Sequence, residues 1–195
     1  MLEEKTLKEI KTRIIDYQNR EIIKTKNNPR FTEFFLKNAE DSIESAKVLF
    51  EITTNPKKQK QFGFTNFNGL LWVVNASYYS MFYMTRALLE NEGIKIKTDL
   101  SIHLVTFDVL VHYFYLTKKL QKEFIEDLLE AENDAAELLG KQKADEIIEE
   151  YYFERRKRGI FTYEMGEILL QTKAKTSLER AQKFRKEILS IIHKY

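Results

Sequence analysis

The sequence predicts an all-α protein, an up-and-down bundle of about six or seven helices. Apolar residues recur at helical spacing over most of the 195 residues, while two prolines and six glycines fall mostly between these periodic stretches. No stretch shows a convincing alternating strand pattern, and no internal repeat is visible. With 43% apolar and 13% aromatic content, the chain can bury a sizeable core as one compact domain.

The first predicted helix runs from about residue 2 to residue 26 and ends in the sequence Asn27-Asn28-Pro29. Its apolar residues repeat with the period of a helix that packs one face on a core. We assign residues 1–28 to an N-terminal helical extension and residues 29–195 to the main helical domain.

A second helix is expected to begin at Thr32 and to end before Pro56, with a broad apolar stripe along one side. Residues 55–68 form the longest irregular stretch, and we expect a surface loop there. The loop is basic at first and aromatic afterwards, with the side chains Lys57, Lys58, Lys60, Phe62, Phe64 and Phe67.

The stretch from Leu70 to Leu89 is nearly all apolar or aromatic and forms the predicted central helix, with Gly93 as its C-cap. A membrane span is the competing interpretation, but Asn75 and Arg86 inside the segment argue against it, as does the lack of a second such segment. The sequence has no Cys and no signal-peptide pattern. We therefore expect a cytoplasmic protein that does not enter a membrane.

Further helices are expected at residues 100–115 and 120–139, and Gly140 is expected to end the second of these. A short acidic helix follows and reaches Phe153. The last predicted helix covers about residues 176–193.

Charge is segregated over the second half of the chain, although the net charge is only +2. Residues 121–150 hold 11 acidic and 3 basic side chains, whereas residues 151–195 hold 5 acidic and 11 basic ones. Either antiparallel neighbours of opposite sign pair at their surfaces, or the basic C-terminal quarter holds a phosphate.

The motifs of common enzyme classes are missing from the sequence: it has no Gly-rich phosphate loop, no Gly-x-Ser-x-Gly elbow and no metalloprotease His pair. His103 and His112 lie nine residues apart, on opposite faces of one predicted helix, so they cannot share a metal ion there. We expect neither a metal nor a cofactor. Metal-free RNA cleavage remains, and it needs an acid or base together with a cation, for which histidine and arginine are the natural pair.

Four residues of the central helix, Asn75, Tyr79, Phe82 and Arg86, are spaced by 4, 3 and 4 and therefore lie along one stripe. An arginine at such a position needs a partner. Either Arg86 pairs with a carboxylate on a neighbouring helix, or it lines a cleft where it binds a phosphate in a bidentate manner.

Residues 75–98, NASYYSMFYMTRALLENEGIKIKT, resemble the central helix of HEPN-domain proteins, which typically reads YYAMFHAARALL followed by GI and KTH. Residues 34–50, FFLKNAEDSIESAKVLF, resemble the preceding helix of that family. The resemblance implies an up-and-down bundle that usually forms a homodimer and is often encoded beside a small nucleotidyltransferase. Many members are toxin ribonucleases of toxin-antitoxin pairs, and others bind nucleotides or RNA.

The nuclease members of that family carry Arg, four to six residues, then His, and this motif is not intact here. Its best counterpart is Arg158-Gly-Ile-Phe-Thr-Tyr163, with Tyr163 at the histidine spacing. Tyrosine has an ordinary pKa near 10 and is a poor base at neutral pH. Asp99 stands where many relatives have His after KT, and His103, one turn later, is the candidate substitute for that histidine.

Together these observations predict a HEPN-type homodimer that binds a nucleotide or RNA phosphate. Arg158, Tyr163 and His103 are the catalytic candidates, if the protein is a metal-independent endoribonuclease. The candidate ligand-binding residues are Arg155, Arg156, Arg86 and Tyr79. The alternatives are a non-catalytic module that docks on a nucleotidyltransferase partner through its central aromatic helix, and a purely structural role for the arginines.

Overall fold

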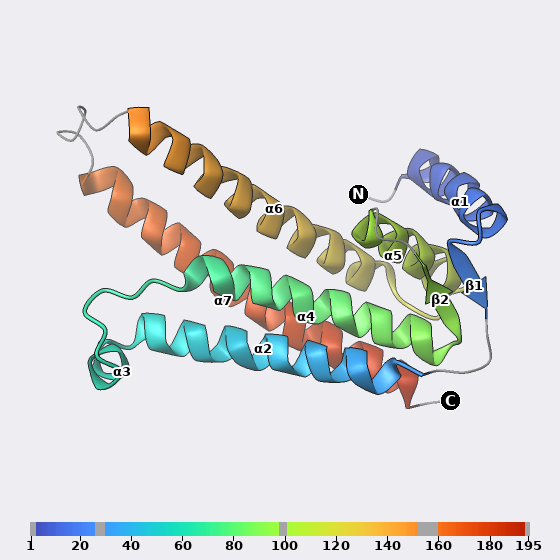
Figure 1. The fold of residues 1–195 in the computed structure, drawn as a ribbon, viewed down its shortest axis with the longest axis horizontal. Helices are drawn as coiled ribbons and strands as arrows, with labels where there is room; N and C mark the ends of the chain where they lie inside the picture. The colour runs from blue at the N-terminus through green and yellow to red at the C-terminus, as the bar shows by residue number, and fades with distance from the viewer. Residues whose placement is uncertain (1–2, 26–29, 98–100, 152–159, 194–195) are drawn as a thin grey trace.

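The computed structural model describes residues 3–25, 30–97, 101–151 and 160–193, and for residues 139–151 and 160–167 it describes the backbone alone. Within these ranges the chain forms seven α-helices, one π-helical segment and a two-stranded antiparallel sheet (Figure 1). The α-helices are α1 (Glu4–Asn19), α2 (Thr32–Thr54), α3 (Pro56–Gln61), α4 (Leu70–Asn91), α5 (Ile102–Leu110), α6 (Lys122–Tyr151) and α7 (Ile160–Ile192). The π-helical segment is Val111–Tyr115, and the strands are β1 (Ile23–Thr25) and β2 (Ile94–Ile96).

The predicted all-α helical bundle is confirmed, and its longest helices are α2, α4, α6 and α7. Helices α2 and α4 run in opposite directions, as do α6 and α7, while α1, α5 and the sheet gather at one end and α3 lies at the other (Figure 1). No helix in the described part of the chain is long and apolar enough to cross a membrane.

Helix α4 lies at the centre and packs against α2, α6 and α7. Of its 22 residues, 15 are buried. Small side chains allow the neighbouring helices to approach it closely: Ala39, Ala46, Ser77, Ser80, Ala174 and Ala181 are all buried. At the contact with α2, the Ser80 hydroxyl donates a hydrogen bond of 2.8 Å to the carbonyl oxygen of Ala39.

The N-terminal segment differs from the sequence-based prediction. The first helix ends at Asn19 rather than near residue 26, because the chain turns at Glu21, whose φ of 56° lies in the left-handed region. After this turn, Ile23 pairs with Ile96 in the sheet, and both side chains join the core. The sequence shows no convincing strand pattern, and this two-stranded sheet is an element that it did not predict.

A buried ion pair fastens α1 to α5. Asp108 is fully buried and accepts hydrogen bonds of 2.7 and 2.8 Å from the Arg13 guanidinium and one of 3.0 Å from the Tyr17 hydroxyl. Burial, followed by the negative charge of Asp108, raises the pKa of Tyr17 to about 12, so its hydroxyl stays protonated and donates. The segment assigned to an extension thus shares the core of the remaining helices.

Two further boundaries are corrected. Helix α6 continues through Gly140 to Tyr151, and α7 begins at Ile160 rather than near residue 176. A single glycine costs a helix only about 1 kcal/mol relative to alanine, and good helix formers surround Gly140. The expected surface loop at residues 55–68 contains the short helix α3, whereas the expected limits of α2 and α4 are confirmed.

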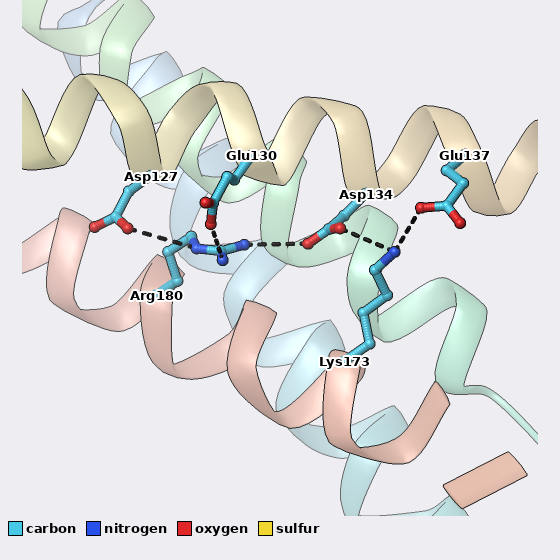
Figure 2. A network of polar contacts seen from close by, with 6 residues as sticks. All are labelled: Asp127, Glu130, Asp134, Glu137, Lys173 and Arg180. Atoms are coloured by element: carbon cyan, nitrogen blue, oxygen red, sulfur yellow. Dashed lines mark hydrogen bonds and ion pairs between the residues drawn. The ribbon is translucent and has the colours of Figure 1, made fainter. Parts of the chain in front are cut away.

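Ion pairs join the described parts of α6 and α7 (Figure 2). Arg180, whose side chain is 12% exposed, reaches three carboxylates of α6: those of Asp127, Glu130 and Asp134, at 3.6, 2.6 and 3.2 Å. Lys173 lies 2.9 Å from Asp134 and 2.8 Å from Glu137. In this part of the chain, the segregated charges pair between antiparallel neighbours.

We expect Arg13→Met to lower the free energy of unfolding by about 3 kcal/mol, because it leaves the buried Asp108 carboxylate without its cation. Water reaches Arg13, whose side chain is 35% exposed, so the loss lies at the lower end of the range for buried pairs. Urea unfolding followed by circular dichroism measures it. Arg20→Met, which removes a solvent-exposed pair with Asp16, is the control and should cost under about 0.5 kcal/mol. Equal effects of the two variants would contradict a structural role for the buried pair.

Arg180→Met should cost about 2 kcal/mol of unfolding free energy, because the carboxylates of Asp127 and Glu130 lose the guanidinium between them and Asp134 keeps only Lys173. The matched control is Lys175→Met on the same helix, since Lys175 makes a single exposed contact of 3.9 Å with Glu179. Urea unfolding at low and high salt is the measurement. A loss no larger than that of the control would show that the ion pairs do not hold α6 to α7.

Candidate functional site

The predicted stripe of α4 lies at the boundary between core and surface. Asn75 and Phe82 are buried, Arg86 is half-buried, and Tyr79 is 41% exposed. The Asn75 amide is satisfied within the helix, because it donates to the carbonyl oxygen of Leu71 at 3.0 Å. The functional candidates of this stripe are therefore Tyr79 and Arg86, whose polar groups are not used in the core.

His103 reaches this stripe from α5. Its Nδ1 atom lies 2.6 Å from the hydroxyl oxygen of Tyr78. The centroid of its ring lies 4.4 Å from that of Phe82 and 6.0 Å from that of Tyr79. The site thus combines residues of the central helix with a histidine from a separate helix.

The protonation states of this cluster follow from its surroundings. Burial, followed by the charge of Arg86, lowers the pKa of His103, so its imidazole is neutral at pH 7. Burial, followed by the charge of Glu132, raises the pKa of Tyr78, so its hydroxyl keeps its proton at pH 7. In the hydrogen bond between this hydroxyl and Nδ1 of His103, the tautomer of the neutral imidazole decides which group donates. Nε2 is the ring nitrogen that Tyr78 does not engage.

Arg86 lies over an aromatic ring rather than beside a carboxylate. The central carbon of its guanidinium is 4.9 Å from the ring centroid of Phe35 in α2. Among the residues that the structure describes, no carboxylate forms an ion pair or a hydrogen bond with it. Burial lowers the pKa of Arg86, which shows that its cation is partly deprived of water. Of the two interpretations given for this arginine, pairing with a carboxylate of a neighbouring helix is not observed in the described part.

Glu90, one helical turn beyond Arg86, has other partners. One of its carboxylate oxygens accepts hydrogen bonds from the backbone N–H groups of Arg30 and Phe31, at 3.0 and 3.3 Å, and lies 3.2 Å from Nζ of Lys95. Glu90 is 5% exposed and anchors the start of α2 and strand β2. Its negative charge acts on Arg86 only at longer range.

A surface groove between α2 and α4 adjoins the stripe. It is lined by Ser42, Ser45, Leu49, Trp72, Asn75, Ala76, Tyr79 and Tyr83. Hydroxyl groups and apolar side chains come from α2, and aromatic rings come from α4. Such a lining can hold a flat, partly polar ligand.

Half-buried carboxylates do not form a metal site here. Burial raises the pKa of Glu132 in α6, whose charge acts on Tyr78. In the described ranges, no group of three His, Cys, Asp or Glu side chains is placed to hold a metal ion. His103 and His112 have separate surroundings, since His112 lies against Tyr113.

Three of the residues selected from the sequence, Tyr79, Arg86 and His103, come together in this site. Arg155, Arg156 and Arg158 lie outside the described residues, and Tyr163 lies in the part of α7 for which the backbone alone is described.

Sequence reasoning missed Phe35 and Tyr78. Tyr78 directly precedes Tyr79 of the stripe. This adjacency in the sequence is the one feature from which its place in the site could have been predicted. The contact of Phe35 with Arg86 joins two helices, so no local pattern shows it.

The sequence matches no protein-family model, no curated protein and no solved structure. The function is therefore inferred from the residues of the site themselves.

We expect His103 to titrate below the ordinary histidine value of about 6.5, and Arg86→Gln to raise its pKa by removing a nearby positive charge. Because the folded state resists protonation of His103, the stability that it contributes is present above about pH 6.5 and is lost as the pH falls below that value. NMR titration of the imidazole signals measures both effects. His112, whose pKa is lowered by burial and by Lys11, should not respond to Arg86→Gln. An unchanged pKa of His103 in that variant would show that the two side chains are not neighbours.

Proposed function

We propose that this chain binds a phosphate group of a nucleotide or of RNA at Arg86 and His103. The observation that supports this most is the half-buried Arg86 cation, which has no carboxylate partner among the described residues. A desolvated cation without a counter-ion is costly, and a bound anion relieves that cost. The planar guanidinium also matches the geometry of phosphate oxygens.

The neighbours of Arg86 suit a nucleotide. Nε2 of His103 supplies a second hydrogen-bond donor for phosphate oxygens in the tautomer in which Tyr78 donates to Nδ1. Tyr79 is 41% exposed and lies 6.0 Å from the His103 ring, so its face can stack on a base. Phe35 holds the guanidinium from the side of α2.

These contacts favour binding over catalysis at His103. A general base needs a free unprotonated nitrogen, and in that same tautomer the unprotonated nitrogen of His103 is hydrogen-bonded to Tyr78. A toxin-type, metal-independent endoribonuclease would additionally require Arg158 and Tyr163, which the resemblance to HEPN-domain proteins suggests. Homodimer formation and a nucleotidyltransferase partner are likewise proposals that rest on this resemblance, whereas a cytoplasmic location is a proposal that rests on the lack of Cys and of a signal-peptide pattern in the sequence.

A second candidate function is that of a non-catalytic interaction module. It is favoured by the exposed aromatic side chains along α2 and α4, since Phe34 is 58% and Trp72 is 57% exposed. Exposed aromatic residues beside a groove are typical of protein interfaces. In this case α4 and α2 would form the surface that docks on the partner.

The decisive experiment is isothermal titration calorimetry with adenosine monophosphate, adenosine and a short single-stranded RNA. We expect the two phosphate-bearing ligands to bind and Arg86→Gln to weaken both at least tenfold, because hydrogen bonds to a charged group contribute about 1.5–3 kcal/mol. Arg86→Lys should bind with intermediate affinity, since it keeps the charge but loses the bidentate geometry.

The control for this experiment is Arg20→Gln, which removes the exposed arginine that follows α1 and should leave binding unchanged. Equal affinity of wild type and Arg86→Gln would assign Arg86 a structural role. Wild-type protein that binds neither phosphate-bearing ligand would reject the site and leave the interaction module as the better explanation.

A further inference from the structure

The segment from Asn55 to Gly69, which we call the α3 tip, is a firmly built projection at one end of the bundle (Figure 1). The Asn55 side chain caps α3 by accepting the N–H groups of Lys57 and Lys58 at 3.1 and 3.3 Å. At its far end, the N–H of Gly69 donates to the Thr53 hydroxyl at 2.9 Å. Both ends of the tip are thereby tied to the chain around them.

Gln59 fixes the return path of the α3 tip. Its amide nitrogen donates to the carbonyl oxygens of Thr53 and Phe67, at 2.9 and 3.1 Å, and its amide oxygen accepts the N–H of Phe67 at 3.1 Å. One side chain thus holds Phe67 through both of its backbone polar groups. The aromatic side chains that follow α3 therefore start from a defined backbone.

Three phenylalanine rings form a stack on the α3 tip. The ring centroids of Phe64 and Phe67 are 5.1 Å apart with planes 22° from parallel, and those of Phe62 and Phe64 are 6.4 Å apart at 27°. Phe67 is half-buried at the base, whereas Phe64 is 44% and Phe62 is 63% exposed. Gly63 lies between them with a φ of 75°, a conformation that glycine adopts without strain. The outer end of the stack therefore faces solvent.

The charge next to this stack is positive. Lys57 and Lys60 are exposed and form no ion pair with any residue that the structure describes, while Lys58 pairs with Glu51. The sequence contains no Asp or Glu from residue 52 to residue 89. The nearest acidic residue before this range is Glu51, and its charge is paired with Lys58.

We propose that the α3 tip binds single-stranded nucleic acid, with an unpaired base stacked on Phe62 and Phe64 and the phosphates held by Lys57 and Lys60. A nucleic-acid base can stack on the exposed end of a set of nearly parallel rings. The lysines next to the rings can then contact the phosphates that alternate with the bases along a single strand. Insertion into a lipid surface would not require parallel rings. A duplex is a poor ligand, because its bases are already stacked on one another.

This site is separate from the one at Arg86. The tip adjoins the start of α4, and Arg86 lies about 24 Å further along the helix axis, at about 1.5 Å per residue. The proposal does not depend on phosphate binding at Arg86, so either site can fail without the other. If both are correct, the ligand of the protein is a strand rather than a mononucleotide.

Fluorescence anisotropy with a labelled, unstructured RNA of about twelve nucleotides tests the proposal. The double variant Phe62→Ser/Phe64→Ser should bind at least about tenfold more weakly than wild type, which corresponds to the loss of one stacked base. Ile15→Ser is the matched control, since it removes a similarly exposed apolar side chain from α1, at the other end of the molecule, and should bind as wild type does.

The lysines are tested by the salt dependence of the same binding. Lys57→Gln/Lys60→Gln should lower the slope of log Kd against log salt concentration by about 1.4, at about 0.7 for each phosphate contact of a single strand. Lys5→Gln/Lys8→Gln, on exposed positions of α1, should leave the slope unchanged.

Three outcomes would overturn the proposal: wild-type protein that does not bind the RNA, equal affinity for a duplex of the same length, or unchanged RNA affinity in both tip variants. Loss of binding to phosphatidylserine vesicles by the tip variants, with RNA affinity unchanged, would assign the tip to a lipid surface instead. Adenosine monophosphate binding should persist in the tip variants and be lost in Arg86→Gln, which separates this test from that of the Arg86 site.

Discussion

Close packing of α4 against α2 and α7 determines where the other elements lie. The hydroxyl of Ser80 touches the backbone of α2 directly. Ser77 in α4 and Ala174 in α7 are small, buried side chains of the two helices that pack on each other there. Larger side chains at these positions would separate the helices, because a dense core has no space to absorb them. With α6 on a further side, a narrow strip of α4 remains at the surface, and that strip carries Tyr79 and Arg86.

This arrangement explains why Arg86 differs from the other buried or half-buried charges. Asp108 and Arg180 each have several partners, and Glu90 is fully engaged by backbone N–H groups and Lys95. Each of these charges joins two elements of the fold. Arg86 joins α4 to α2 through its cation–π contact with Phe35, and none of the described carboxylates pairs with its charge. A half-buried charge that lacks a counter-ion among the described residues is a candidate position for binding a ligand.

Much of the bundle could be predicted from the sequence, since the limits of α2 and α4 follow from periodicity and from Pro56 and Gly93. The strands could not, because three residues are too few for an alternating pattern and the pairing partners lie far apart in sequence. The predicted helix end at Gly140 was wrong, because a helix can continue through a single glycine. For the site, the stripe carrying Tyr79 and Arg86 followed from spacing, whereas the approach of His103 depends on how α5 packs.

Hydrogen bonds at both ends of the pair of helices α2 and α4 have a consequence for the groove. At one end the carboxylate of Glu90 in α4 accepts the backbone N–H groups of Arg30 and Phe31 before α2. At the other end the Thr53 hydroxyl of α2 accepts the N–H of Gly69, the residue before α4. A helix pair closed at both ends cannot slide or splay without breaking one of these closures. The conformational entropy of the groove walls is therefore lost already during folding. The binding free energy of a ligand between α2 and α4 does not include this entropic cost.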